Sequence, residues 1–177
     1  MKRVAVALLL LLAGCAGSLP AGTETPTRER TATVTHVVDG DTIDVRFADG
    51  STDTVRLLGV DAPETRGDVT PSEFGLPDTE AVRDCLRTAA DDATAFAQAR
   101  LAGREVVVTT DPTADRRGGY GRLLAYVRAP GADESFNRAL LAAGHARVYV
   151  TGFSRLSAFR DAAEAAQAAD RGLWACD

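Results

Sequence analysis

The feature that most constrains the fold is a series of short β-branched segments, three of which follow one another closely. These three segments cover residues 33–38, 41–47 and 54–60. The second alternates, with Ile43, Val45 and Phe47 on one face, as a half-buried strand does. An Asp-Gly pair at 49–50 is the turn signal that joins antiparallel strands. The pattern therefore predicts a three-stranded meander that buries one face.

A long segment with helical spacing follows the third strand. We expect a helix with Asp78 and Thr79 as caps that runs to Leu101, with Gly103 where helices usually stop. The remaining expected elements are strands at 105–110 and 122–128 and helices at 135–143 and 154–169. Five strands and about three helices, one inserted between the third and fourth strands, predict an α+β domain. We expect an antiparallel five-stranded β-barrel of the OB-fold type.

The first residues are typical of an export signal. Lys2 and Arg3 precede a short apolar run that is too short for a comfortable transmembrane helix, so residues 1–14 are predicted to be a signal peptide. The sequence Leu-Ala-Gly-Cys at 12–15 resembles a lipobox, in which the cysteine becomes lipidated after cleavage. The alternative is an ordinary signal followed by a chance cysteine.

Residues 15–31, from a lipidated Cys15 onward, are predicted to be a flexible tether, and residues 32–177 to be the folded domain. The expected location is extracellular, at the outer face of the cell membrane, where the lipid anchors the protein. The two remaining cysteines, Cys85 and Cys176, would then meet an oxidising compartment. They form either a disulfide or two free thiols.

Composition excludes two kinds of chemistry. Lys2 is the only lysine among the 20 basic residues, so the mature protein cannot use a lysine nucleophile or a Schiff base. A net charge of −5 argues against binding nucleic acid through overall basicity.

Acidic residues gather in two turns that leave neighbouring predicted strands. Asp41 lies between the first and second strands, and Asp61 and Glu64 follow the third. Brought to one end of the sheet, they would suit a hard cation such as Ca²⁺, which takes about six to eight oxygen ligands. The alternative is a pair of solvated bends. Arg56 lies mid-strand nearby, and the alternation of its neighbours leaves its face undecided.

An Arg/Gly-rich loop at 116–122 supplies a second group of candidate residues. Its glycines allow close approach to a ligand, and Tyr120 offers a flat surface for a base or a sugar. Arg122 is suited to bidentate contacts with phosphate oxygens.

Four motifs occur together, in order and at sensible spacing. They are DGDT at 39–42, VRLLGVDAPET at 55–65, YGRLLAYV at 120–127 and RGLW at 171–174. This set resembles the staphylococcal nuclease (thermonuclease) family, from about Thr33 to Trp174. The resemblance implies an OB-fold barrel with helices and a Ca²⁺-dependent phosphodiesterase that acts on DNA and RNA. It also implies that the 5′ oxygen leaves, which gives 3′-phosphate ends.

The resemblance implies a calcium site at the two acidic turns. Asp41 and Asp61 would supply carboxylates, and Ala62 a backbone carbonyl, at a position where the best-known member has threonine. Asp39 matches an acid that supports the ligands and is not one itself.

The resemblance also implies catalytic and substrate-binding residues. Arg56 and Arg122 would grip the scissile phosphate, and Glu64 would act on the attacking water. Tyr120 and Tyr149 would lie beside the bound nucleotide.

The chain departs from the family pattern in a longer stretch at 66–92, which contains Cys85. This stretch is expected to brace the fold, and the alternative is that it shapes the entrance of the site. DNA and RNA are the expected partners, no protein partner is expected, and the protein is expected to be a monomer. The alternative function is a non-catalytic OB-fold lipoprotein that binds nucleic acid or another partner.

Overall fold

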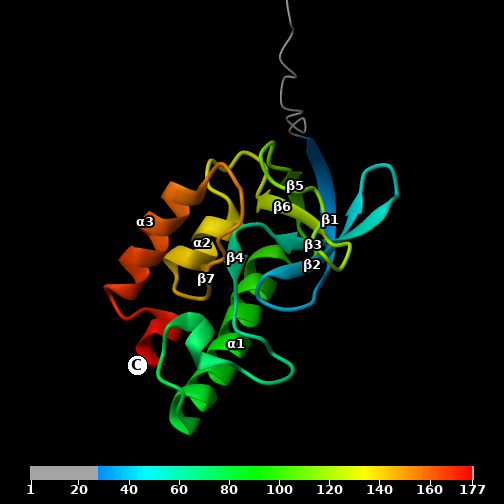
Figure 1. Ribbon diagram of the computed structural model, residues 1–177. Helices are drawn as coiled ribbons and strands as arrows, with labels where there is room; N and C mark the ends of the chain where they lie inside the picture. Colours follow the sequence, from blue (N-terminus) through cyan, green and yellow to red (C-terminus); the bar gives the residue numbers. More distant parts are fainter. Residues whose placement is uncertain (1–27, 177) are drawn as a thin grey trace, which may run out of the picture.

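The structure, a computed structural model, describes residues 28–176. The predicted signal peptide, Cys15 and the tether up to residue 27 lie outside the described residues. Five strands close into a barrel in the order β1-β2-β3-β6-β5 (Figure 1). They are β1 (Glu29–Val37), β2 (Thr42–Phe47), β3 (Thr52–Leu57), β5 (Glu105–Thr109) and β6 (Leu123–Arg128). The predicted five-stranded barrel is confirmed.

The first three strands form the predicted antiparallel meander. Ile43, Val45 and Phe47 point into the barrel and are buried, as their alternation predicted. The expectation that the whole barrel is antiparallel is wrong, because β3 and β6 run parallel. The reason is geometric: when neighbouring strands alternate in direction, a closed ring with an odd number of strands must contain one parallel pair.

Two strand boundaries differ from the prediction by more than two residues. Strand β1 begins at Glu29, and Arg30 pairs with Val108 of β5, so the expected start of the domain at residue 32 lies inside this strand. The third strand ends at Leu57 instead of residue 60. The chain turns at Gly59, whose φ is +78° and where a Cβ would lie 2.6 Å from the Phe153 ring. This turn redirects the chain out of the barrel sheet.

After the turn, β4 (Val60–Asp61) pairs with β7 (Arg147–Val148) in a separate two-stranded sheet. The pairing is antiparallel and sets Asp61 opposite Arg147. This small sheet carries one of the acidic turns away from the barrel strands and toward the second half of the chain.

The three predicted helices are present as α1 (Glu80–Leu101), α2 (Phe136–Ala142) and α3 (Leu156–Gln167). The Thr79 hydroxyl caps α1 by accepting a hydrogen bond from the Val82 N–H, and Ser135 caps α2 in the same way. In Figure 1, α2 and α3 lie on one side of the barrel and α1 extends below it. No helix within residues 28–176 combines the length and the apolar composition that crossing a membrane requires.

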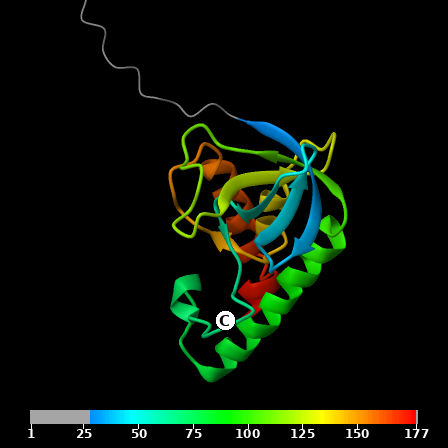
Figure 2. The same ribbon diagram turned by 90° about the vertical axis from the view of Figure 1, so that its right-hand side faces the viewer.

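The stretch at 66–92 packs into a second hydrophobic cluster outside the barrel core. It contains the 3-10 helix η1 (Pro71–Phe74) and the first half of α1, and it meets the C-terminal 3-10 helix η2 (Gly172–Cys176). Cys85 and Cys176 form a disulfide with an S–S distance of 2.00 Å, which decides between the two alternatives for these cysteines. Figure 2 shows the C-terminal segment beside α1. The stretch therefore does brace the fold.

Candidate active site

The two acidic turns meet directly at one end of the barrel. Asp41 is only 5% exposed, and its Oδ2 accepts a hydrogen bond from the Ala62 N–H at 2.8 Å. The turn that leads into Asp41 is closed by Asp39, whose Oδ1 accepts from the Asp41 N–H at 3.1 Å. Gly40 lets this turn lie against α1, since a Cβ at position 40 would lie 2.7 Å from the Cβ of Ala93.

Arg56 joins the two acids. Its side chain points from β3 into the site, and only 15% of it is exposed. The guanidinium forms ion pairs with Asp41 and, at 2.7 Å, with Oδ1 of Asp61, and it also donates to the Val60 carbonyl at 3.1 Å. The face that the sequence left undecided is thus the site face, because only there does the buried guanidinium find anionic partners.

Burial raises the pKa of Asp41 to about 7 against the stabilising charge of Arg56, and repulsion from Asp39 and Asp61 adds to the rise. A buried carboxylate in this position needs positive charge beside it. Arg56 supplies such charge, and a bound cation would supply more.

The carboxylates of Asp41 and Asp61 are of the type that a hard cation prefers. Arg56 bridges them, and the Ala62 N–H donates to Asp41, so Ala62 contributes a hydrogen-bond donor here and not an oxygen. Within residues 28–176 there is no group of three or more His, Cys, Asp or Glu side chains placed to hold a metal. Water or substrate oxygens would therefore have to complete the coordination of a cation at this pair.

Glu64 lies in the solvent-accessible part of the same turn. Partial burial raises the pKa of its carboxyl group, the negative charges of Asp39 and Asp61 add to the effect, and Arg56 and Arg122 oppose it. A raised pKa makes this carboxylate a better proton acceptor than an ordinary glutamate.

Arg122 and Tyr120 flank the site on the side of Asp41. The Arg122 guanidinium donates to the hydroxyl of Thr42, the residue after Asp41, at 3.3 Å. Its Cζ lies 5.6 Å from the ring centre of Tyr120, which is 90% exposed. The side chain of Tyr120 is therefore free to contact a ligand.

Arg147 is a site residue that the sequence reasoning missed. Its Nη2 lies 2.6 Å from Oδ2 of Asp61, across the β4–β7 ladder. Tyr149, two residues further along, presents its ring 5.8 Å from the Arg147 guanidinium and is about half exposed. The alternating sequence Arg-Val-Tyr-Val at 147–150 was the available signal, because it sets Arg147 on the same face as Tyr149.

The stretch at 66–92 also reaches the site. The ring of Phe74, in η1, lies 5.5 Å from the guanidinium carbon of Arg147. The segment that braces the fold through Cys85 therefore also contributes to the wall of the site.

A barrel end that carries two bridged carboxylates, an exposed glutamate and several arginines is suited to phosphodiester chemistry, in which the growing negative charge on the phosphate must be stabilised. The chain belongs to the family described as staphylococcal nuclease homologue, whose sequence pattern matches residues 54–176. The family resemblance read from the four motifs is confirmed.

Three individual relatives show how far the sequence similarity extends along the chain. The chain is 27% identical to the Thermonuclease of Staphylococcus hyicus over 186 residues, which cover 98% of this chain and 99% of that one. It is 35% identical to the SPbeta prophage-derived endonuclease YokF of Bacillus subtilis, over 66% of this chain and 33% of the endonuclease. It is 34% identical to an uncharacterised protein of Methanocaldococcus jannaschii, over 80% of this chain and 70% of that protein. The chain thus matches only about a third of the Bacillus endonuclease.

Proposed function

We propose that this protein is a Ca²⁺-dependent nuclease that hydrolyses phosphodiester bonds of DNA and RNA and leaves 3′-phosphate ends. The observation that carries the proposal is the Arg56 bridge between the buried Asp41 and Asp61. Glu64 and Arg122 belong to the same site, since the charges of Arg56 and Arg122 both lower the pKa of the Glu64 carboxyl group. All of these groups come from a single chain, which supports activity as a monomer.

The arginines hold the charge that develops on the phosphate. A phosphodiester repels nucleophiles, and its transition state places more negative charge on the phosphoryl oxygens. Arg56 and Arg122 carry permanent charge and planar donor groups that match those oxygens. Ca²⁺ bound at Asp41 and Asp61 would supply Lewis-acid stabilisation of the same oxygens.

Glu64 takes the proton. A water molecule attacks phosphorus in line with the leaving 5′ oxygen, and the new P–O bond forms as the P–O5′ bond breaks. The Glu64 carboxylate accepts the proton of the attacking water, which its raised pKa favours. The 5′ oxygen leaves and takes a proton from solvent, so the phosphate stays on the 3′ oxygen.

The location is part of the proposal. The export signal and the lipobox-like Cys15 support a lipid-anchored protein at the outer face of the membrane. The Cys85–Cys176 disulfide supports export as well, since disulfides persist mainly in oxidising compartments. The substitution Cys15→Ser is expected to release the protein from the membrane fraction into the medium. A Cys15→Ser protein that stays in the membrane fraction would contradict the proposed lipid anchor.

The proposed activity is tested by digesting end-labelled single-stranded DNA and RNA with the purified protein, in Ca²⁺ or in excess chelator, across a range of salt. We expect cleavage with Ca²⁺, none with chelator, and products that carry 3′-phosphates. Full activity in excess chelator would overturn the calcium requirement. Binding of the oligonucleotides without cleavage under any condition would favour the non-catalytic OB-fold module.

A further inference from the structure

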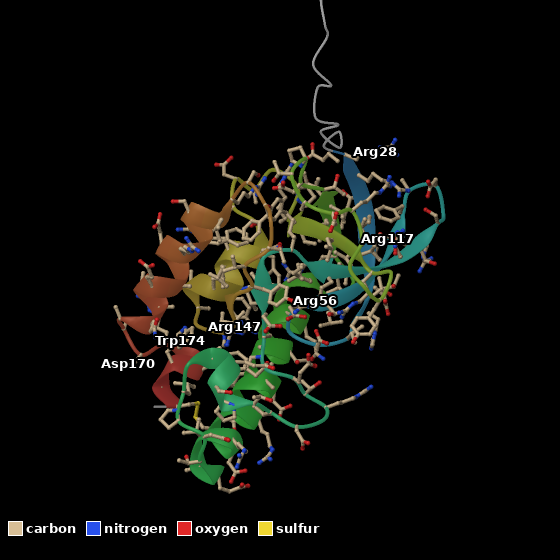
Figure 3. All side chains as sticks on the ribbon, viewed as in Figure 1. Arg28, Arg56, Arg117, Arg147, Asp170 and Trp174 are labelled. Carbon is tan, nitrogen blue, oxygen red and sulfur yellow. A yellow bond between two sulfur atoms is a disulfide. The ribbon has the colours of Figure 1, made fainter. Side chains whose placement is uncertain are left out.

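Two arginines from different elements share one carboxylate. Arg56 of β3 pairs with Oδ1 of Asp61, and Arg147 of β7 pairs with Oδ2. Figure 3 labels both arginines near the centre of the view, below the barrel strands, whereas Arg117 lies out on the barrel. Both oxygens of Asp61 are thus occupied by guanidinium groups.

The hydrogen bonding of Arg147 is incomplete. Its Nε is buried and has no hydrogen-bond partner among the described residues, whereas Arg56 also donates to the Val60 carbonyl. About a quarter of the Arg147 side chain remains exposed. The exposed part of this guanidinium, and not its buried Nε, is therefore accessible to a ligand beside Asp61.

The Asp61 carboxylate offsets the cost of burying the Arg147 guanidinium. A largely buried guanidinium without an anion is costly. When a cation takes up the charge of Asp61, Arg147 needs a new anionic partner, and a phosphate is the anion that its planar donor group fits best.

The surroundings of Arg147 repeat those of Arg122. Arg122 lies on the Asp41 side of the Arg56 bridge with Tyr120 near its guanidinium, and Arg147 lies on the Asp61 side with Tyr149 near its own. Each pair combines a cation for a phosphate with an exposed ring on which a base can stack.

We propose that Arg147 binds a second phosphate of the nucleic acid, next to the one held by Arg56 and Arg122. This inference rests on the proposed nuclease function and extends it. The strand then runs across the site from Tyr120 to Tyr149, with at least two phosphates engaged. Stacking on two exposed rings requires unpaired bases, so the ligand is single-stranded.

The experiment measures binding, not cleavage. In a Glu64→Gln background that keeps the substrate intact, Arg147→Gln and Arg147→Lys are compared by titration with a single-stranded ten-residue deoxyoligonucleotide in Ca²⁺, over a salt series. The matched control is Arg128→Gln, because Arg128 is similarly exposed and is paired with Glu29 on the barrel. Ca²⁺ binding is titrated separately by calorimetry without nucleic acid.

We expect Arg147→Gln to weaken oligonucleotide binding about 10- to 100-fold, the effect of losing a charge-assisted hydrogen-bonding partner. The slope of log K against log salt is expected to fall by about 0.7, the value for one phosphate contact on a single strand. Arg147→Lys keeps the slope and loses part of the affinity, and Arg128→Gln matches the parent. Ca²⁺ binding is not weakened by Arg147→Gln, since Asp61 loses a competing cation.

Equal affinity and equal slope in Arg147→Gln and its parent would overturn the inference. A fall in Ca²⁺ affinity parallel to the fall in oligonucleotide affinity would also overturn it, because Arg147 would then only orient Asp61. Thermal unfolding checks that the Gln variant is folded, and the Lys variant provides the charge-dependent comparison if it is not. If the wild-type protein cleaves DNA and Arg147→Gln binds the oligonucleotide normally, this inference alone is wrong. If the wild-type protein binds neither Ca²⁺ nor DNA, the proposed function is wrong as well.

Discussion

The side-chain amide of Asn137 donates a hydrogen bond to the carbonyl of Leu58 at 3.0 Å, and so ties α2 to the barrel where the chain leaves β3. The same amide donates to the Ala125 carbonyl and accepts from the Val127 N–H, both in β6. Asn137 is fully buried, so water cannot replace its amide as the hydrogen-bond partner of these backbone groups. One asparagine thus closes the barrel beside its single parallel strand pair.

Asn137→Ala is expected to lower the free energy of unfolding by about 3 kcal/mol, because it leaves two buried backbone groups, the Leu58 carbonyl and the Val127 N–H, without the Asn137 amide. Urea unfolding followed by circular dichroism measures the change. Gln98→Ala, which removes an exposed amide on α1, is the control and should change stability little. A loss below about 1 kcal/mol in Asn137→Ala would show that water replaces the lost hydrogen bonds.

Asp111 should stabilise the protein near neutral pH and lose this effect in acid. Burial opposes its ionisation, but hydrogen bonds from Ser154, Thr113 and Tyr126 outweigh burial and hold the pKa of this carboxyl well below its usual range. Three of these donors lie at 2.7 to 2.9 Å: the Tyr126 hydroxyl and the N–H groups of Thr113 and Ser154. The carboxylate thus holds together the segment after β5, strand β6 and the segment before α3.

A depressed pKa in the folded state adds stability that is complete above the unfolded pKa, about 3.9, and is lost as pH falls through the folded pKa. Asp111→Asn is therefore expected to cost about 2 kcal/mol or more near neutral pH. The difference from wild type should shrink as the pH drops below about 4. Unfolding free energies between pH 7 and pH 2 test this, with the exposed Asp115→Asn as control, and a difference that is constant with pH would contradict it.

The disulfide is expected to contribute stability chiefly through the unfolded chain. Cys85 and Cys176 are 91 residues apart, and closing a loop of that length corresponds to roughly 4 kcal/mol. The double replacement Cys85→Ser with Cys176→Ser should lower the melting temperature by about 10 °C. Differential scanning calorimetry, with the reduced wild-type protein as a parallel sample, measures it. An unchanged melting temperature would mean that the second hydrophobic cluster holds without the bond.

Glu64 is expected to affect turnover far more than stability. Glu64→Gln removes the proton acceptor but keeps the size of a largely exposed side chain, so kcat should fall about 100-fold or more while the fold is unchanged. Glu73→Gln, an exposed position in η1, provides the control. If Glu64→Gln retained a near-normal rate with an intact Ca²⁺ requirement, another group would have to accept the proton.

Much of the fold followed from local patterns. Alternation in Ile43, Val45 and Phe47 defined a strand, and Thr79, predicted as a cap, marked the start of a helix that the structure confirms. The parallel pair of β3 with β6 did not follow, because it results from closing the ring and not from any residue within either strand. The two-residue strands β4 and β7 were likewise too short to carry a periodic signal.

The sequence by itself determined which chemical groups the site could contain: two acidic turns, a glutamate, and arginines in place of lysine everywhere after Lys2. It could not determine which groups face one another, since an arginine in a strand can point to either side. Tertiary structure decided that Arg56 faces the site and that Arg147, 86 positions further along the chain than Asp61, lies opposite Asp61. The reason is that ion pairs between distant residues depend on how strands are brought together, and only barrel closure and the β4–β7 ladder bring these together.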